Sequence, residues 1–142
     1  RTRELFDFVE TYARTGEPSP TTVLLMAAAR RDFFLTVQHG QFYQGKPVIG
    51  YDLPGFGDEL CGLPYLPRLI AKARAKLVGS MGDDIIYCCE NDRRFFRDHG
   101  NIHPADFLRV VWAAGDSDPK VYDYVRQRTL SVSSAVPDNE QT

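Results

Sequence analysis

Apolar residues recur at helical spacing in several separate stretches of the chain. In the clearest stretch, residues 66–77, they follow an i, i+3, i+4, i+7, i+11 pattern that places them on one face of a helix. These residues are Leu66, Leu69, Ile70, Ala73 and Leu77. Pro67 fits the first turn, where its missing N–H would be unpaired anyway, and Gly79 is expected to end the helix. The pattern predicts that Leu69 and Ile70 are buried.

Similar periodicity predicts five further helices. A Pro- and Gly-rich break, "TGEPSP", separates the first two of them. Asp92 and Asp118 are the expected N-caps of two later helices, and Gly40, Gly100 and Gly115 are expected terminators. The helices are predicted over about residues 3–14, 22–38, 93–99, 104–114 and 119–128, with Thr21 or Thr22 capping the second.

Residues 41–63 interrupt this periodicity with five glycines, two prolines and scattered aromatic residues. We interpret the segment as a long ordered loop packed by Phe42, Tyr43, Tyr51 and Phe56, since loops of this length in compact domains are functional or connect parts. "PVIGY" and "IIYCC" are each compatible with a short strand or an extended segment. The predicted fold is therefore mostly α: a compact single-domain bundle of about five or six helices with a long ordered loop and at most one or two short strands.

The length of 142 residues suits one domain with one core. Within it we distinguish an N-terminal helical pair (1–45), a helical domain (46–128) and a polar C-terminal tail (129–142). No apolar run approaches the roughly 18 residues that a membrane span needs, so no membrane insertion is expected.

Charge and cysteine content limit the function classes. The formal net charge of −2 and the sequence pI of about 5.9 give no overall attraction to nucleic acid, so nucleic-acid binding is not expected. The cysteines are Cys61, Cys88 and Cys89, an odd number with two adjacent, which is a poor disulfide framework. We expect reduced thiols and a cytoplasmic location.

The helix over 66–77 carries four basic residues off its apolar stripe: Arg68, Lys72, Arg74 and Lys76. A solvated face, with Lys72 and Lys76 exposed, is the preferred interpretation. Anion binding by Arg68 at the helix N-terminus is a second. The third is that Arg68 and Arg74 pair with flanking acids, namely Asp58, Glu59, Asp83 or Asp84. We expect Arg68 to be the one basic residue that is held in place, so that its replacement matters more than that of Lys72 or Lys76.

The stretch "CCEND" with His99 and His103 suggests three roles for Cys88 and Cys89. A metal site is disfavoured because adjacent thiols point in different directions. A reactive thiol beside Arg93 and Arg94 is the second role, and two small buried side chains are the default. His39 and His99 each precede a glycine at a helix end, where an imidazole can meet the last carbonyls. We expect no metal and no cofactor.

Three landmarks, in this order, resemble a bacterial family known as domain of unknown function 5069. They are "GLPYLPRLIAKARAKLVG", "YCCENDRRFF" and "HPADFLRVVWAAGDSDPKVYDYV", and the resemblance covers about residues 51–128. Cys61 departs from the family pattern, in which a second glycine is usual, and this relaxes the tight turn that such a pair would form. The resemblance implies a small helical domain and no established activity.

The leading hypothesis is a non-catalytic binding or accessory module that contacts a protein partner, a larger assembly or a small anionic ligand. The alternative is a small enzyme or ligand-binding protein whose pocket lies near Arg68, Cys88, Asp92 and the loop over 42–62. The candidate ligand- or anion-binding residues are Arg68, Arg74, Cys88, Asp92 and Tyr51. Ionisable groups converging on a concave pocket would favour the enzyme, whereas an apolar patch ringed by arginines would favour the module.

Overall fold

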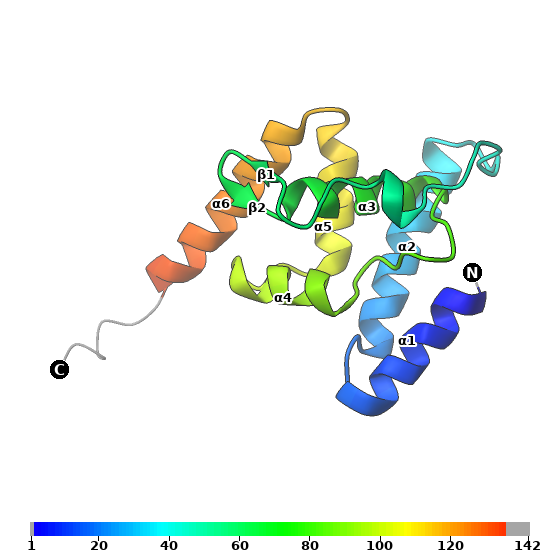
Figure 1. Ribbon diagram of the computed structural model, residues 1–142, viewed down its shortest axis with the longest axis horizontal. Helices are drawn as coiled ribbons and strands as arrows, with labels where there is room; N and C mark the ends of the chain where they lie inside the picture. The colour runs from blue at the N-terminus through cyan, green and yellow to red at the C-terminus, as the bar shows by residue number, and fades with distance from the viewer. Residues whose placement is uncertain (1, 136–142) are drawn as a thin grey trace.

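The computed structural model describes residues 2–135. This part of the chain contains six α-helices, which confirms the predicted mostly α-helical fold (Figure 1). The helices are α1 (Thr2–Thr15), α2 (Pro20–Thr36), α3 (Leu66–Val78), α4 (Glu90–Asp98), α5 (Pro104–Ala114) and α6 (Asp118–Ala135). A short 3-10 helix, η1 (Gly50–Asp52), and two short strands, β1 (Glu59–Leu60) and β2 (Leu63–Pro64), lie between α2 and α3. No helix within residues 2–135 has the length and apolar character that a membrane crossing demands.

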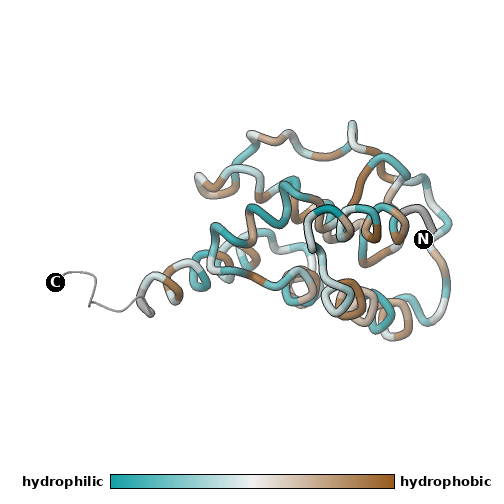
Figure 2. The backbone as a smooth tube through the Cα atoms, turned by 90° about the horizontal axis from the view of Figure 1, so that it is seen from below, coloured by the Kyte–Doolittle hydropathy of each residue, from teal (hydrophilic) through white to brown (hydrophobic). Residues whose placement is uncertain are grey.

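Helix α3 packs against α2, α5 and α6 and so occupies the centre of the bundle (Figure 1). Leu69 and Ile70 are 0% and 1% exposed, as the apolar stripe predicts. Met26 of α2 and Phe107 of α5 belong to the same buried cluster. Hydrophobic positions therefore alternate with polar ones around most helices of the bundle (Figure 2).

The segment between α2 and α3 is largely irregular, as predicted, and includes a two-residue hairpin turn. The prediction that its aromatic residues pack the loop is wrong, because Phe42, Tyr43, Tyr51 and Phe56 are all exposed. Strands β1 and β2 pair antiparallel, with Leu60 opposite Leu63. Cys61 and Gly62 form the turn with φ angles of 52° and 81°, the two positive values that a type I′ turn requires. Cys61 thus holds a left-handed conformation without the freedom of glycine. Of the two possible strands, "PVIGY" contributes an isolated bridge from Val48 to Met81, and "IIYCC" forms turns.

Three helix starts differ from the prediction, and the smallest difference is at α6, which begins at Asp118 itself, so that Asp118 lies in the first turn where the sequence predicts it as the N-cap. Helix α2 is capped by Ser19, whose Oγ accepts a hydrogen bond from the Thr22 amide at 3.1 Å, and Pro20 occupies its first turn. Helix α4 begins at Glu90 after the N-cap Cys89, so Asp92 lies inside the first turn and the predicted Asp92 cap is wrong. The physical reason is that the Asp92 carboxylate accepts backbone N–H groups from residues before the helix, as described below.

The predicted glycine terminators of α3 and α4 are confirmed. Gly79 is the left-handed C-cap of α3, and Gly100 has a φ of 90° after α4. At Gly100 a Cβ atom would lie 2.5 Å from the carbonyl oxygen of Arg128, so glycine is what allows α6 to approach. Helix α6 continues through Ala135, although composition predicts a tail over residues 129–142, and its last turns project from the bundle (Figure 1). The rest of that predicted tail, residues 136–142, lies outside the described residues.

Candidate functional site

Asp92, one of the predicted site residues, is fully buried and accepts four hydrogen bonds. The donors are Tyr65 Oη at 2.5 Å, Lys72 Nζ at 2.7 Å, and the amides of Cys88 and Cys89 at 2.8 and 3.2 Å. Lys72 Nζ also lies 3.3 Å from Cys89 Sγ. We call Tyr65, Lys72, Cys89 and Asp92 the Asp92 cluster. It joins α3 to the start of α4 through one carboxylate.

The local backbone explains how Asp92 is held. Cys88 has a positive φ of 76°, whereas Cys89 is extended with a φ of −70°. This alternation turns two successive amides toward one point, an arrangement that binds anions. Asp92 follows three residues after the N-cap, where the dipole of α4 also favours negative charge.

Lys72 and Lys76 are buried, at 4% and 8% exposure, so the prediction that they are exposed is wrong. Lys72 pairs with Asp92, and Lys76 pairs with Glu4 of α1. A buried ammonium group is tolerated when a carboxylate compensates its charge, and both lysines meet this condition. The basic residues of α3 therefore connect it to neighbouring elements.

Arg74 and Arg68 are also fixed, so the expectation that Arg68 alone is held in place is wrong. Arg74 pairs with Asp118 at 2.5 Å. Arg68 donates from Nη1 to the Pro54 carbonyl at 2.9 Å, and its guanidinium lies 4.1 Å from the centre of the Phe56 ring. The anchor of Arg68 is thus a carbonyl and an aromatic ring, in place of the carboxylate expected from the preceding loop.

The five predicted site residues do not converge on one point. Cys88 and Asp92 are in contact, and Arg68 is connected to them through two rings, since Phe56 packs against Tyr65 at 5.9 Å between ring centres. Arg74 is directed toward Asp118, and Tyr51 is 93% exposed on η1. The sequence interpretation also missed Tyr65 and Lys72. Lys72 follows Leu69 by three residues, which places both on one side of α3, and this spacing was a usable signal.

The Asp92 cluster has the chemistry of a structural network. Burial, and secondly the charge of Asp92, raise the pKa of the Cys88 thiol to about 12, so the thiol stays protonated at neutral pH. Burial and Asp92 likewise raise the pKa of Tyr65 above its usual value. His99 donates from Nδ1 to the Phe95 carbonyl at 2.8 Å, as expected for a helix end. Within residues 2–135 no group of three or more His, Cys, Asp or Glu side chains is placed to hold a metal ion.

The three free cysteines should differ sharply in reactivity, because Cys61 is exposed, Cys89 is half-buried and Cys88 is buried. We expect iodoacetamide at pH 8 to alkylate Cys61 rapidly in the native protein and to leave Cys88 unmodified, since the thiolate is the nucleophile. Peptide mass spectrometry measures each site, and all three should react in denaturant. Alkylation of native Cys88 at the rate of Cys61 would contradict its raised pKa and its burial.

Two hollows lie outside the Asp92 cluster. The first, which we call the arginine cavity, has a volume of about 350 Å³ and lies between the α1–α2 turn, α4 and the start of α5. Arg93, Arg97 and Glu17 are its charged lining residues. The second, which we call the apolar groove, has a volume of about 870 Å³ and lies between α1, α2 and the start of the long loop.

The family model for the domain of unknown function DUF5069 matches residues 57–135, more than half of the chain. The chain belongs to the DUF5069 family. The matched part contains the hairpin, α3 to α6 and the whole Asp92 cluster, whereas α1, α2 and most of the long loop precede it. DUF5069 membership assigns no activity, and no curated protein and no solved structure matches the chain.

Proposed function

We propose that the chain is a non-catalytic binding module whose apolar groove binds an amphipathic helix of a partner protein. The partner helix would carry acidic residues along the edges of its own apolar face. The observation that carries this proposal is an open apolar surface with basic residues beside it. Phe8 and Met26 form buried parts of the groove, and Leu5 and Phe42 remain exposed on its sides. Walls from α1 and α2 with apolar side chains between them suit an amphipathic helix.

Helix α2 supports the docking proposal because it is apolar around most of its circumference. Met26 and Ala29 are buried, Val23, Ala27 and Phe34 line the groove, and Leu24, Leu25 and Leu35 are exposed outside its lining. Helix α1 likewise exposes apolar side chains, namely Leu5, Phe6, Val9 and Tyr12. Helices that are hydrophobic all round are normally covered, and exposed apolar patches mark interaction surfaces.

Charge around the groove favours an acidic partner. Arg30, Arg31 and Lys76 line it, with Glu4 as the one acidic lining residue. Glu4 is already paired with Lys76, and the Arg30 guanidinium donates from Nε to the Lys76 carbonyl at 3.1 Å. Arg31 is exposed, so its positive charge is the one best placed to favour an acidic partner over a basic one.

The test uses two synthetic helical peptides with leucine at i, i+3, i+4 and i+7, one flanked by glutamates and one by lysines. Fluorescence anisotropy should show tighter binding of the glutamate peptide, and Arg31→Glu should reverse the order. Leu5→Glu should weaken binding of the glutamate peptide, whereas Leu24→Glu, at another exposed leucine that lies outside the groove lining, should not. Failure of both peptides to bind, or an unchanged order in Arg31→Glu, refutes the proposal.

A second copy of the chain is the competing occupant, and light scattering distinguishes it. A wild-type dimer that Leu5→Glu converts to monomer would show that the groove is filled by self-association and would overturn the partner proposal. We place the module in a reducing compartment such as the cytoplasm, since its three cysteines are free thiols.

The enzyme alternative has weaker support. Asp92 is fully buried and its carboxylate is engaged by four donors, which leaves it poorly suited to act as a general base. Arg68 is hydrogen-bonded to the Pro54 carbonyl, and Cys88 is buried. Arg68, Cys88 and Asp92, the residues of the predicted enzyme pocket, therefore do not line one shared cavity.

A further inference from the structure

We propose that the arginine cavity is a binding site for a small organic carboxylate, whose place on the two arginines is taken in this structure by the carboxylate of Glu17, a lining residue. This inference is independent of partner docking in the apolar groove. It rests on a cavity of about 350 Å³, a size typical of small-ligand sites, and on two arginines that converge on one carboxylate oxygen in it.

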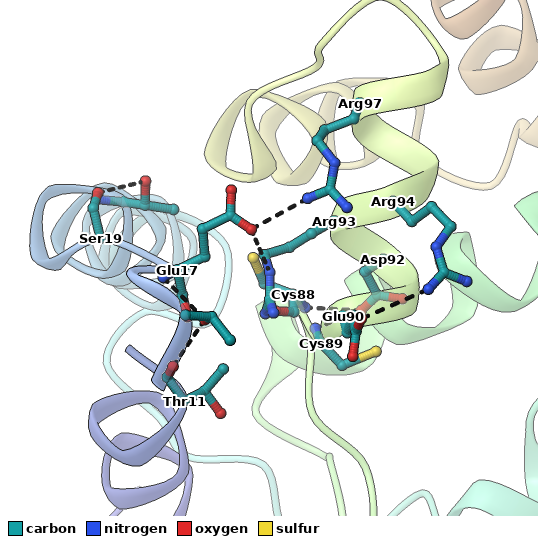
Figure 3. Close-up of polar contacts among 12 residues, drawn as sticks. Thr11, Glu17, Ser19, Cys88, Cys89, Glu90, Asp92, Arg93, Arg94 and Arg97 are labelled. Carbon is teal, nitrogen blue, oxygen red and sulfur yellow. Dashed lines mark hydrogen bonds and ion pairs between the residues drawn. The ribbon is translucent and has the colours of Figure 1, made fainter. Parts of the chain in front are cut away.

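The two arginines lie one turn apart on α4 and share the Glu17 carboxylate (Figure 3). Arg97 Nη1 lies 3.2 Å and Arg93 Nε 3.4 Å from the same atom, Glu17 Oε2. Like charges four residues apart on a helix repel each other, so an anion between them is favourable. One carboxylate balances one of the two charges, which leaves the cavity with a net positive charge.

Arg93 is built into the protein and does not depend on Glu17 for its position. Its side chain is 11% exposed, and its Nη1 donates to the Cys88 carbonyl at 2.8 Å. Its buried Nε makes no hydrogen bond of good geometry within the described residues, since the contact with Glu17 is long. A ligand carboxylate could therefore give Arg93 Nε a better acceptor than Glu17 does.

The Glu17 carboxylate takes the position of the ligand carboxylate, and the ligand can displace it. It is 49% exposed and lies on the turn between α1 and α2, where the Thr15 hydroxyl donates to its carbonyl at 3.1 Å. Its carboxylate shows which chemical group the arginines hold, and its exposure allows it to swing out. The backbone can stay in place while the side chain is displaced.

The other lining residues are largely apolar and suit a ligand with an apolar group attached to its carboxylate. Pro18, Phe96, Ile102 and Pro104 line the cavity beside the arginines. His103 also lines it, and its Nδ1 accepts from the Ala105 amide at 3.0 Å, which leaves the ring hydrogen of the neutral form on Nε2 as a donor. An aryl or short alkyl carboxylate fits this combination of two cations, one N–H donor and an apolar wall.

The experiment titrates the ¹⁵N-labelled protein with benzoate, acetate and inorganic phosphate. It follows the NMR signals of the arginine Nε–H groups and of the backbone amides of the non-proline residues within 16–22 and 101–105. Benzoate should bind more tightly than acetate or phosphate and shift these signals. Glu17→Gln should tighten benzoate binding roughly five- to tenfold because a competing charge is removed. Arg97→Gln should weaken it by about tenfold or more.

Arg94→Gln is the matched control, because Arg94 lies on the same helix, is 59% exposed and does not line the cavity. Its benzoate affinity should equal that of the wild type, and thermal unfolding verifies that each variant is folded. An absence of benzoate-induced shifts in both the wild type and Glu17→Gln overturns the site. Phosphate binding as tight as benzoate binding overturns the assignment to a carboxylate, and weaker benzoate binding in Glu17→Gln overturns the role of Glu17 as a competitor.

Discussion

Replacing Lys72 with methionine is expected to lower the free energy of unfolding by about 3–5 kcal/mol. The variant would leave Asp92 as a buried carboxylate without its compensating cation, although Tyr65 and two amides would still donate to it. Urea denaturation at neutral pH measures the loss. Lys120→Met, at an exposed position of α6, is the matched control and should change stability by less than about 0.5 kcal/mol.

The double variant Lys72→Met/Asp92→Asn separates the ion pair from simple packing. Asparagine keeps an oxygen acceptor for the amides of Cys88 and Cys89 but removes the unpaired charge. The double variant should therefore lose clearly less stability than the sum of the two single variants, as expected for residues in contact. Strict additivity would show that the Lys72–Asp92 pair does not contribute as a unit.

Truncating Leu69 to alanine should cost about 2–5 kcal/mol, since the side chain is fully buried in the centre of the bundle. Leu24→Ala is the matched control, because the same atoms are removed from a side chain that is 69% exposed. That control should stay within about 0.5 kcal/mol of the wild type. Equal losses in the two variants would mean that α3 is not the centre of the core.

The ranking of these effects reverses the expectation from sequence that replacing Arg68 matters most. Arg68 is half-buried and bonded to a carbonyl, so a lysine there loses ring stacking and one hydrogen bond. Lys72 and Asp92 are buried together, so removing Lys72 leaves the Asp92 carboxylate as a buried charge without its cation. The loss of stability is therefore expected to be larger for the buried charge of Lys72 than for the charge of Arg68 at the start of α3.

The sequence predicted the features that depend on neighbours in the chain. The stripe through Leu69 and Ile70, the glycine ends of α3 and α4, and the mostly helical fold all follow from local spacing and turn chemistry. One wrong prediction concerned the burial of residues at the edge of the stripe. Lys72 and Lys76 lie three and seven residues after Leu69, and burial there depends on which element packs alongside.

The partners of the basic residues could not be derived from spacing. Lys76 pairs with Glu4, which lies 72 residues away in the chain. Arg68 donates to a main-chain carbonyl, a group that every residue carries, so the sequence does not indicate it as a partner. The residue type of Asp92 predicts a helix cap, but the positive φ of Cys88 directs the amides before the helix toward the Asp92 carboxylate. Only tertiary packing determines such contacts.

The attachment of α1 has a consequence for local opening. Among residues 4–15 Phe8 is the one buried side chain, and Lys76 of α3 contacts α1 through its pair with Glu4 and through the Phe8 ring. An element with so little enclosed surface opens without global unfolding. The amide hydrogens of α1 should exchange with solvent faster than those of α3, and an occupant of the apolar groove would slow that exchange, since it binds the closed form.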